Sequence, residues 1–398
     1  MEIKARIIGN ELEYVKEVLD AGFRTSRSTE MMKRFETAFA KKFGARFAIS
    51  QVNGTTALHS ILEAIELRPG DEVIVPSLTM ASTAMAVLQA NATPVFSDVD
   101  PDTFLVDEKH IMERVTQKTK AIITVSLYGL APDMDPIMQL AKDNNLFVLE
   151  DNAQGFLAEY KERVIGTIGD AATFSFQSSK HITSGEGGVI ITDDSELAQN
   201  ARRAASLGYA SIGPDKGAIL KRDIQDPGFS RHLNLGWNYR MPELCAAVAL
   251  AQLENIDSLV QRRIDAARLF LDVVRDCEWL IPQKVGTHYR HSYWTFVVKL
   301  EHPDISWHGF RDRYAELGGD GIYSVWKPAY REPMFQSRNF QGREHFISKQ
   351  NLESYKPGCC PNAERLQPRL LQFKTNYWVW ERAELQAEVL GKTIEFFS

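Results

Sequence analysis

Lys180 is the residue of this chain best suited to covalent chemistry. It follows an apolar, aromatic run at 171–177, lies among serines, and precedes a glycine-rich stretch. An amine that forms a Schiff base needs partial exclusion of water to lower its pKa, neighbours that orient it, and an open backbone for a flat ligand. We expect water exclusion from Phe174 and Phe176, orientation from Ser175, Ser178 and Ser179, and open backbone at Gly185, Gly187 and Gly188. Most lysines are solvated surface charges, so the hypothesis also depends on residues upstream.

A glycine turn upstream has the composition of a phosphate-binding site. The short apolar run 46–50 leads to Asn53, Gly54, Thr55 and Thr56, where a helical pattern begins. Backbone amides, hydroxyls and the positive end of the helix dipole meet at such a turn, which suits a phosphate. A simple helix N-cap, which requires only one of the hydroxyls, accounts for these residues equally well.

Asp151 ends another apolar run, 147–151, and is followed by Asn152 and Gln154. A carboxylate at the end of a buried strand is costly unless it faces a cation or a bound group. The alternative is that Asp151 caps the following turn. Together with the glycine turn and Lys180, it matches the needs of one cofactor. Pyridoxal 5'-phosphate requires a phosphate site, an acid that keeps its ring nitrogen protonated, and an amine that carries its aldehyde.

The pattern between residues 46 and 194 predicts an α/β fold with a mainly parallel sheet. Runs rich in Val, Ile and Phe occur at 72–77, 93–100, 121–129, 147–151, 171–177 and 188–194. Helical spacing at 134–145 separates two of them, and such alternation is typical of a sheet covered on both faces with ligands at the strand ends. Helices are also expected within 11–44, around a break at 21–29. For 398 residues we expect a large domain at 1–250 and a smaller α+β domain at 251–398, joined by a helix at about 251–277.

Composition and charge argue against several classes of function. Hydrophobic residues make up 44% and charged residues 25%, as in a soluble globular protein. A net charge of −6 without a Lys/Arg cluster argues against nucleic acid or a membrane surface as partner. No run approaches the ~18 apolar residues of a spanning helix, and no signal-peptide core begins the chain, so we expect a cytoplasmic protein. The four cysteines and nine histidines lack the spacing of a disulfide framework or a metal site, so no metal is expected.

These segments resemble the DegT/DnrJ/EryC1/StrS sugar aminotransferases, which have the aspartate-aminotransferase fold (fold type I of the pyridoxal-phosphate enzymes). The resemblance covers nearly the whole chain. It is carried by NGTTALHSIL, GDEVIVPSLTMAST, PVFSDVDPDTF, TKAIITVSLYGLAPDMD, LEDNAQG, GDAATFSFQSSKHITSGEGGVIITDD and LGWNYRMPELCAAVALAQL. The last three are highly specific when they occur together.

The resemblance implies roles for individual residues. Lys180 is the catalytic lysine that carries the cofactor and shuttles protons, and Asp151 pairs with the pyridine nitrogen. The implied cofactor-binding residues are Gly54, Thr55 and Ser175 at the phosphate, with Thr56 in the same turn, and Gln154 beside the ring hydroxyl. Two positions depart from the family pattern, since Met80 replaces a frequent aromatic residue over the ring, and Ser126 replaces a frequent His. A methionine still packs on a ring face through its polarizable sulfur.

The family also implies a homodimer with active sites at the subunit interface. Asn238, in GWNYRM, matches the position that reaches the partner's phosphate. The implied reaction transfers an amino group from glutamate or glutamine to a nucleotide-linked or acidic ketosugar, in amino-sugar biosynthesis for lipopolysaccharide or antibiotic sugars.

The sequence is also compatible with other functions. One alternative is an aminotransferase acting on a keto-cyclitol of the scyllo-inosose type. Another is a non-catalytic regulatory or binding protein, which has no need for Lys180 and Asp151; no helix-turn-helix or basic patch is evident. A dehydratase of the same family usually has His in place of the lysine, whereas here His181 follows Lys180.

Aromatic and basic residues are candidates for substrate binding. They are Trp294, Trp326, Lys327, Tyr330, Tyr377 and Trp378, with Arg27 and Arg231 earlier in the chain. Aromatic faces suit the CH-rich faces of sugars, and Arg or Lys suits a phosphate or carboxylate. Several of the aromatic residues are equally suited to filling the core of the small domain. The Gly-, Pro- and charge-rich loop 211–234 is either a flap over the site or a surface excursion. We expect an anionic ketosugar to be preferred over a neutral keto-cyclitol.

Overall fold

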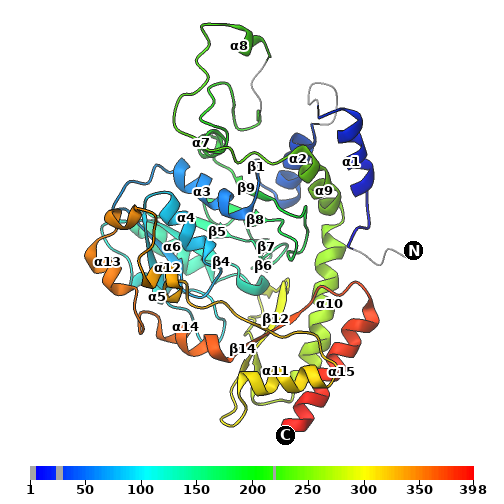
Figure 1. The fold of residues 1–398 in the computed structure, drawn as a ribbon. Coiled ribbons are helices and arrows are strands. Elements are labelled where there is room, and N and C mark those ends of the chain that lie inside the picture. The colour runs from blue at the N-terminus through cyan, green and yellow to red at the C-terminus, as the bar shows by residue number, and fades with distance from the viewer. Residues whose placement is uncertain (1–5, 24–29, 218–220) are drawn as a thin grey trace.

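A seven-stranded sheet forms the centre of the molecule. The computed structural model describes residues 6–23, 30–217 and 221–398. The strands are β1 (Phe47–Gln51), β2 (Glu72–Pro76), β3 (Thr93–Ser97), β4 (Thr119–Val125), β5 (Phe147–Asp151), β8 (Ala171–Ser175) and β9 (Gly188–Thr192). They pair in the order β1-β9-β8-β5-β4-β2-β3 (Figure 1). β9 is antiparallel to both neighbours and the pairs from β8 to β3 are parallel, which confirms the predicted mainly parallel sheet.

Both faces of this sheet are buried, as the alternation of side chains along its strands shows. In β1, Phe47 and Ile49 belong to one hydrophobic core and Ala48 belongs to another. In β9, Ile190 lies in the first core and Ile191 in the second. Because successive side chains of a strand point to opposite faces, each face must be covered by helices.

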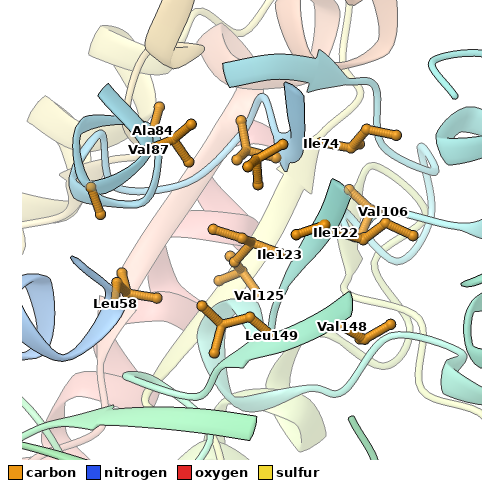
Figure 2. Packing of buried hydrophobic residues seen from close by; sticks show 14 of the residues in the cluster. Leu58, Ile74, Ala84, Val87, Val106, Ile122, Ile123, Val125, Val148 and Leu149 are labelled. Carbon is orange, nitrogen blue, oxygen red and sulfur yellow. The ribbon is translucent and has the colours of Figure 1, made fainter. Parts of the chain in front are cut away.

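The first core lies under helices that follow the strands. They are α3 (Gly54–Ala64), α4 (Ser82–Gln89), α5 (Glu108–Met112), α6 (Met134–Asn144) and α7 (Ser195–Ala205). Figure 2 shows Leu58 of α3 and Val87 of α4 pointing toward Ile123 and Leu149 of the sheet, and all four side chains are buried. The apolar faces of these helices therefore hold the ends of the strands in fixed positions.

The second core is built from aromatic side chains. It lies under α1 (Glu11–Asp20), α2 (Met31–Phe43) and α9 (Glu243–Glu254), the first two of which confirm the helices predicted within 11–44. Its buried rings are Phe35, Phe39, Phe43, Phe156, Phe174 and Phe176. Phe39 lies at the centre, with ring centroids 4.4 Å from Phe43, 5.2 Å from Phe174 and 5.9 Å from Phe176.

Helix α10 (Ile256–Val274) connects the two parts of the molecule (Figure 1). Its first half, including Leu259, packs in the second core, and its second half, including Phe270, packs in a third core. The predicted helix at 251–277 begins later than expected, because Asn255 has φ −109° and ψ 10° and separates α10 from α9. The predicted stretch is therefore divided between the end of α9 and α10, and its role as a bridge between two domains stays a prediction.

The third core supports a small antiparallel sheet. Its strands are β10 (Leu280–Pro282), β12 (Thr295–Leu300), β14 (Leu370–Lys374) and β13 (Tyr323–Ser324), in that order across the sheet. Helices α10, α11 (Trp307–Glu316) and α15 (Trp380–Phe397) pack against it. A second small sheet pairs β6 (Glu159–Tyr160) with β7 (Arg163–Val164) and with β11 (Tyr289–Arg290). The domain boundary at residue 250 stays a prediction.

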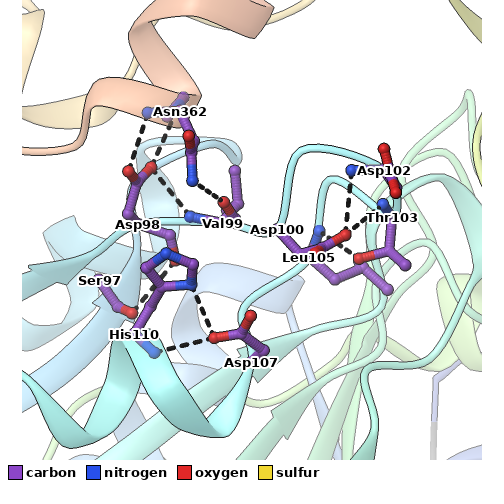
Figure 3. Close-up of polar contacts among 11 residues, drawn as sticks. Ser97, Asp98, Val99, Asp100, Asp102, Thr103, Leu105, Asp107, His110 and Asn362 are labelled. Atoms are coloured by element: carbon purple, nitrogen blue, oxygen red, sulfur yellow. Dashed lines mark hydrogen bonds and ion pairs between the residues drawn. The ribbon is translucent and has the colours of Figure 1, made fainter.

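Part of the C-terminal half returns to the large sheet. It contains α12 (Pro333–Gln336), α13 (Lys349–Ser354), α14 (Pro361–Leu366) and the short turns η3 (Ala329–Arg331), η4 (Arg343–Phe346) and η5 (Gln367–Arg369). Tyr330 and Phe335 belong to the first core. Asp98, just after β3, accepts hydrogen bonds from the backbone N–H groups of Asn362 at 2.8 Å and Ala363 at 2.9 Å, which fixes the start of α14 (Figure 3).

Helix α8 (Lys221–Gln225), within the predicted loop 211–234, lies away from the body of the molecule, at the top of Figure 1. A backbone bridge between Tyr209 and His232 closes the base of this loop. The role of the loop as a flap over the site stays a prediction. Within the described ranges, none of the helices combines the length and apolar character needed to cross a bilayer.

We predict that Phe39→Ala lowers the free energy of unfolding by about 3–5 kcal/mol, because it removes the central ring of a fully buried cluster. Urea unfolding followed by fluorescence measures the change. The matched control is Leu385→Ala on α15, whose side chain is 48% exposed, and which should change stability by less than about 0.5 kcal/mol. Equal losses in the two variants would contradict the assignment of this core.

Candidate active site

The carboxyl ends of the central strands bring the predicted residues to one edge of the sheet. Asp151 is the last residue of β5, and it lies between Val125 of β4 and Thr173 of β8 in the pairing register. Ser175 ends β8, and Lys180 follows it by a short loop. Because neighbouring parallel strands end at the same edge, residues that are far apart in the chain meet there.

Asp151 is 5% exposed and both of its carboxylate oxygens accept hydrogen bonds. The hydroxyl of Thr83, in α4, donates to Oδ2 at 2.9 Å, and the backbone N–H of Ala153 donates to Oδ1 at 3.2 Å. Burial raises the pKa of the Asp151 carboxyl, whereas these two donors and the positive charge of Lys180 act to lower it. The Ala153 contact resembles the capping alternative, but Thr83 and Lys180 come from other parts of the site.

Lys180 has the properties expected of a reactive amine. Removal from water lowers the pKa of its side chain to about 8; the nearby Asp151 carboxylate acts against this shift, and the Arg263 guanidinium adds to it. The Nζ atom lies 4.3 Å from the ring centroid of Trp294, over the face of the indole. A substantial fraction of such an amine is neutral near pH 8, as nucleophilic attack and proton transfer require.

The neighbours that hold Lys180 differ from those expected. The hydroxyl of Ser179 donates to the side-chain oxygen of Gln177 at 2.7 Å, and the hydroxyl of Ser178 accepts from the amide of Gln177 at 2.9 Å. The prediction that these hydroxyls orient the amine is therefore wrong, because Gln177 engages them. Their backbone carbonyls matter instead, since Arg263 and the indole of Trp294 bind the carbonyl of Ser179.

Aromatic contact with Lys180 also comes from another part of the chain. Phe174 and Phe176 are fully buried in the second core, beneath α2. Trp294 supplies the ring against the amine, and Trp326 stacks parallel to it with 5.8 Å between centroids. Trp294 was predicted only as a sugar-binding candidate. Arg263 was missed, although a lone arginine on the buried face of an otherwise amphipathic helix is a signal that the sequence contains.

The glycine turn is both a capped helix terminus and an open cradle. Asn53 and Thr56 form a reciprocal capping box in which the Thr56 N–H donates to Asn53 Oδ1 at 2.8 Å. The Thr56 hydroxyl donates to the Asn53 carbonyl, so Thr56 serves the cap. Among the described residues, the N–H groups of Gly54 and Thr55 have no hydrogen-bond acceptor. The capping alternative therefore describes Asn53 and Thr56, and phosphate binding by Gly54 and Thr55 stays a prediction.

Ser175 lies directly against this cradle. A Cβ atom at Gly54 would meet the Cβ of Ser175 at 2.9 Å, and one at Gly188 would meet the Asn53 carbonyl oxygen at 2.4 Å. Only glycine fits at these two positions without displacement of the backbone or of Ser175. Two free amides, a hydroxyl and a helix N-terminus therefore converge where a phosphate group fits.

Three further predicted cofactor residues differ in their surroundings. Gln154 is buried, and its side-chain oxygen accepts from the backbone N–H of Tyr128 at 2.9 Å. Met80 precedes α4 and its side chain is 47% exposed. Asn238 is exposed and its backbone pairs with Ser206. Their contacts with a cofactor stay predictions.

The candidate substrate residues divide into two groups. Tyr330 and Tyr377 are buried in the first and third cores, so the core-filling alternative describes their packing. Trp294 and Trp326 stack beside Lys180, while Lys327 and Arg231 are exposed and Trp378 is half-buried. Arg27 lies outside the described residues.

Comparison with known proteins defines the class to which this arrangement belongs. The solved aminotransferase from Psychrobacter cryohalolentis superposes with a TM-score of 0.86, at 28% identity over 97% of this chain and 96% of that one. Solved structures of GDP-4-keto-6-deoxymannose-3-dehydratase superpose with a TM-score of 0.78 at 25% identity, covering 96% of this chain and 96–97% of theirs. One of them holds GDP-perosamine, and another, from E. coli, holds hydrated pyridoxal phosphate. The fold is that of the fold type I pyridoxal-phosphate enzymes, as expected.

Sequence comparison identifies the family. A model of the DegT/DnrJ/EryC1/StrS aminotransferase family matches residues 5–372, and the chain belongs to that family. Among its relatives, GDP-perosamine synthase of Escherichia coli O157:H7 is 38% identical over 73% of this chain and 75% of that protein. GDP-perosamine synthase of Caulobacter vibrioides is 39% identical over 74% and 76%. The chain is a transaminase of amino-sugar biosynthesis with pyridoxal phosphate as cofactor, and the amide cradle, Asp151 and Lys180 fit the three parts of that molecule.

We predict that the full-length protein, stripped of cofactor, captures pyridoxal phosphate with a rate that rises with pH and is half-maximal near pH 8, where the Lys180 amine loses its proton. In Asp151→Asn the half-maximum moves to lower pH, because the carboxylate that stabilises the ammonium form is gone. The absorbance of the bound cofactor follows the reaction. A half-maximum near the ordinary pKa of a lysine would show that Lys180 is not desolvated.

Proposed function

We propose that the protein transfers an amino group from glutamate to a GDP-linked ketosugar and so forms a GDP-linked amino sugar of the perosamine type. The observation that carries this is the desolvated Lys180 amine beside the Asp151 carboxylate, in a chain 38–39% identical to two GDP-perosamine synthases. The GDP-perosamine held by a structural neighbour supports the same class of ligand.

Lys180 is the group that moves protons at the reacting carbon. Bound pyridoxal phosphate supplies the carbonyl that accepts the amino group and a ring that withdraws electrons. The free Lys180 amine would act as the base, because a pKa of about 8 leaves it partly neutral at physiological pH. Trp294 limits its position, since the indole face contacts Nζ.

Asp151 holds a negative charge at the strand end. Thr83 and Ala153 fix the orientation of its carboxylate with one hydrogen bond to each oxygen. This carboxylate would hold the pyridine nitrogen protonated in a site from which water is largely excluded, where such an interaction is stronger than in bulk water.

The turn before α3 would hold the phosphate. The N–H groups of Gly54 and Thr55 and the hydroxyl of Ser175 would serve as its hydrogen-bond donors, and the helix dipole would add a favourable field. Thr56 contributes indirectly through the capping box that fixes the turn. Gln154 and Met80 would complete the contacts with the ring.

Lys180 also separates this proposal from dehydration by a related enzyme, in which a His usually replaces the lysine. His181 is fully buried, and its Nε2 lies 3.0 Å from the carbonyl oxygen of Ser292. Burial and the nearby Arg263 hold its pKa well below the usual value, so the ring stays neutral and is a poor proton acceptor. His181 therefore does not take the place of Lys180 as the base. A non-catalytic binding protein would have no need for Lys180 and Asp151, so we do not propose that function.

We predict that kcat/KM for a GDP-linked 4-keto-6-deoxymannose, with glutamate as donor, exceeds that for scyllo-inosose by more than about 100-fold, since contacts with the nucleotide are used to lower the barrier. Lys327→Ala, beside Trp326, raises KM for the nucleotide sugar, whereas Lys356→Ala, another exposed lysine, does not. Steady-state kinetics on both ketones measures this. A higher kcat/KM for the cyclitol, unchanged in Lys327→Ala, would sink the proposed substrate.

The proposal includes a homodimer with shared sites, in which Asn238 of one subunit binds the cofactor phosphate of the other. Its exposed side chain and the exposed Leu233 and Leu235 nearby support this, because such apolar exposure is typical of a surface that a partner covers.

We predict that Lys180→Ala and Asn238→Ala, each inactive alone at limiting cofactor, regain activity when mixed and allowed to exchange subunits. Random exchange gives half hybrids with one competent site each, so activity recovers to about a quarter of wild type. Enzyme assays of the mixture, with sedimentation to verify a dimer, measure this. No recovery despite proven exchange, or an active monomer, would refute the shared site.

A further inference from the structure

Arg263 of α10 is a buried cation without an acidic partner. Its side chain is 2% exposed, and among the described residues no carboxylate pairs with it. Its guanidinium instead donates to three backbone carbonyls, those of Ser179 at 2.8 Å, Lys180 at 2.9 Å and Trp294 at 2.7 Å. A buried charge satisfied only by neutral acceptors is costly, so its retention calls for an explanation beyond packing.

Another buried arginine shows the ordinary arrangement. Arg202 of α7 is 5% exposed and binds Glu36 through two hydrogen bonds of 3.0 Å and 2.8 Å, which neutralises its charge. Arg263 lacks such a counterion, so its positive charge is felt by the groups around it. Lys180 is one of them, since Arg263 lowers the pKa of its amine.

The contacts of Arg263 join the two sides of the Lys180 amine. Through the carbonyls of Ser179 and Lys180 it holds the backbone that carries the amine. Through the carbonyl of Trp294 it holds the ring against which Nζ lies, and the indole N–H of Trp294 donates back to Ser179 at 2.9 Å. The Thr375 hydroxyl donates to the same Trp294 carbonyl at 2.8 Å. One planar guanidinium therefore fixes the amine relative to its aromatic neighbour.

We propose that Arg263 is a positioning residue for Lys180, which sets both the geometry and the charge state of the amine without touching substrate or cofactor. This rests on the proposed function, in which Lys180 carries the cofactor and moves the proton. A small displacement of a reacting group lowers the rate strongly, and a fixed positive charge nearby favours the neutral, proton-accepting form.

The other charged groups around Lys180 determine what a variant would show. Asp151 on β5 stabilises the ammonium form, and Arg263 on α10 opposes it. Arg6 donates to the carbonyl of Lys180 from the N-terminal segment, and it adds a second positive charge near the loop. His181 contributes no charge, because its pKa lies well below the usual value. When Arg263 is removed, the effect of the Asp151 carboxylate on the pKa of Lys180 is no longer opposed by that positive charge.

The decisive variant is Arg263→Met, measured by the pH dependence of cofactor capture by the full-length chain stripped of cofactor. We expect the half-maximal pH to move upward, from near 8 toward the ordinary value of a lysine, because a positive neighbour is lost. The matched control is Arg262→Met, the preceding residue of α10, whose guanidinium also donates to carbonyls, those of Tyr377 and Trp378, and not to the Lys180 loop. The control should leave the half-maximum unchanged. An unshifted half-maximum in folded Arg263→Met would overturn the proposal.

Arg263→Lys decides the matter if Arg263→Met fails to fold. A lysine keeps the charge but cannot bridge the carbonyls as a planar guanidinium does. We expect a half-maximum near that of wild type, an unchanged KM, and a kcat reduced on the order of 10- to 100-fold through misplacement of the amine. Wild-type kcat in this variant would overturn the positioning role.

Lys180→Ala separates this inference from the function on which it rests. If that variant still captured the cofactor covalently and turned over substrate, the proposed function would fail, whatever the Arg263 variants did. If Lys180→Ala is inactive and the Arg263 variants behave as wild type, only the role of Arg263 is refuted.

Discussion

Burial of the Lys180 amine lowers its pKa to about 8, while the carboxylate of Asp151 acts in the opposite direction. Each group alone would be costly to bury, and each makes burial of the other cheaper. The carboxylate alone would raise the pKa of the amine and so favour its charged form, and desolvation alone would lower the pKa further and favour the neutral form. The balance keeps the amine close to neutrality, where one group can both gain and lose a proton. The contact of the Lys180 amine with the ring of Trp294 and the unpaired positive charge of Arg263 adjust the same balance between the charged and the neutral amine.

The sheet makes this pairing possible. Asp151 ends β5 in register with Val125 and Thr173, so its carboxylate emerges at the edge where β8 also delivers Ser175 and the Lys180 loop. Helices on both faces bury the strands and leave that edge as the place where polar groups gather. The aromatic second core packs against β8, and α10, whose first half belongs to the same core, brings Arg263 to the loop. Rigid helices and strands therefore set the position of the Lys180 amine, although Lys180 itself lies on a loop.

Much of this was predictable from the sequence, and the failures have a common cause. Strands such as 147–151, the capped turn at Asn53 and the positions of Asp151 and Lys180 follow from local patterns of hydrophobicity and from residues close together in the chain. Contacts between distant segments were not predictable in this way. Nearby serines were expected to orient Lys180, whereas Arg263 and Trp294, which lie far along the chain, hold it. A periodic pattern shows that a face is buried, but it does not show which remote side chain completes it.

Borohydride reduction of the cofactor-loaded enzyme, followed by proteolysis and mass spectrometry, tests the central claim most directly. The reduction makes the bond between the cofactor and its lysine permanent, so the labelled peptide identifies the residue that carries pyridoxal phosphate. Our account predicts the pyridoxyl group on Lys180 and on no other lysine, with the label lost in Lys180→Ala. A label on a different lysine in the wild-type protein would contradict it.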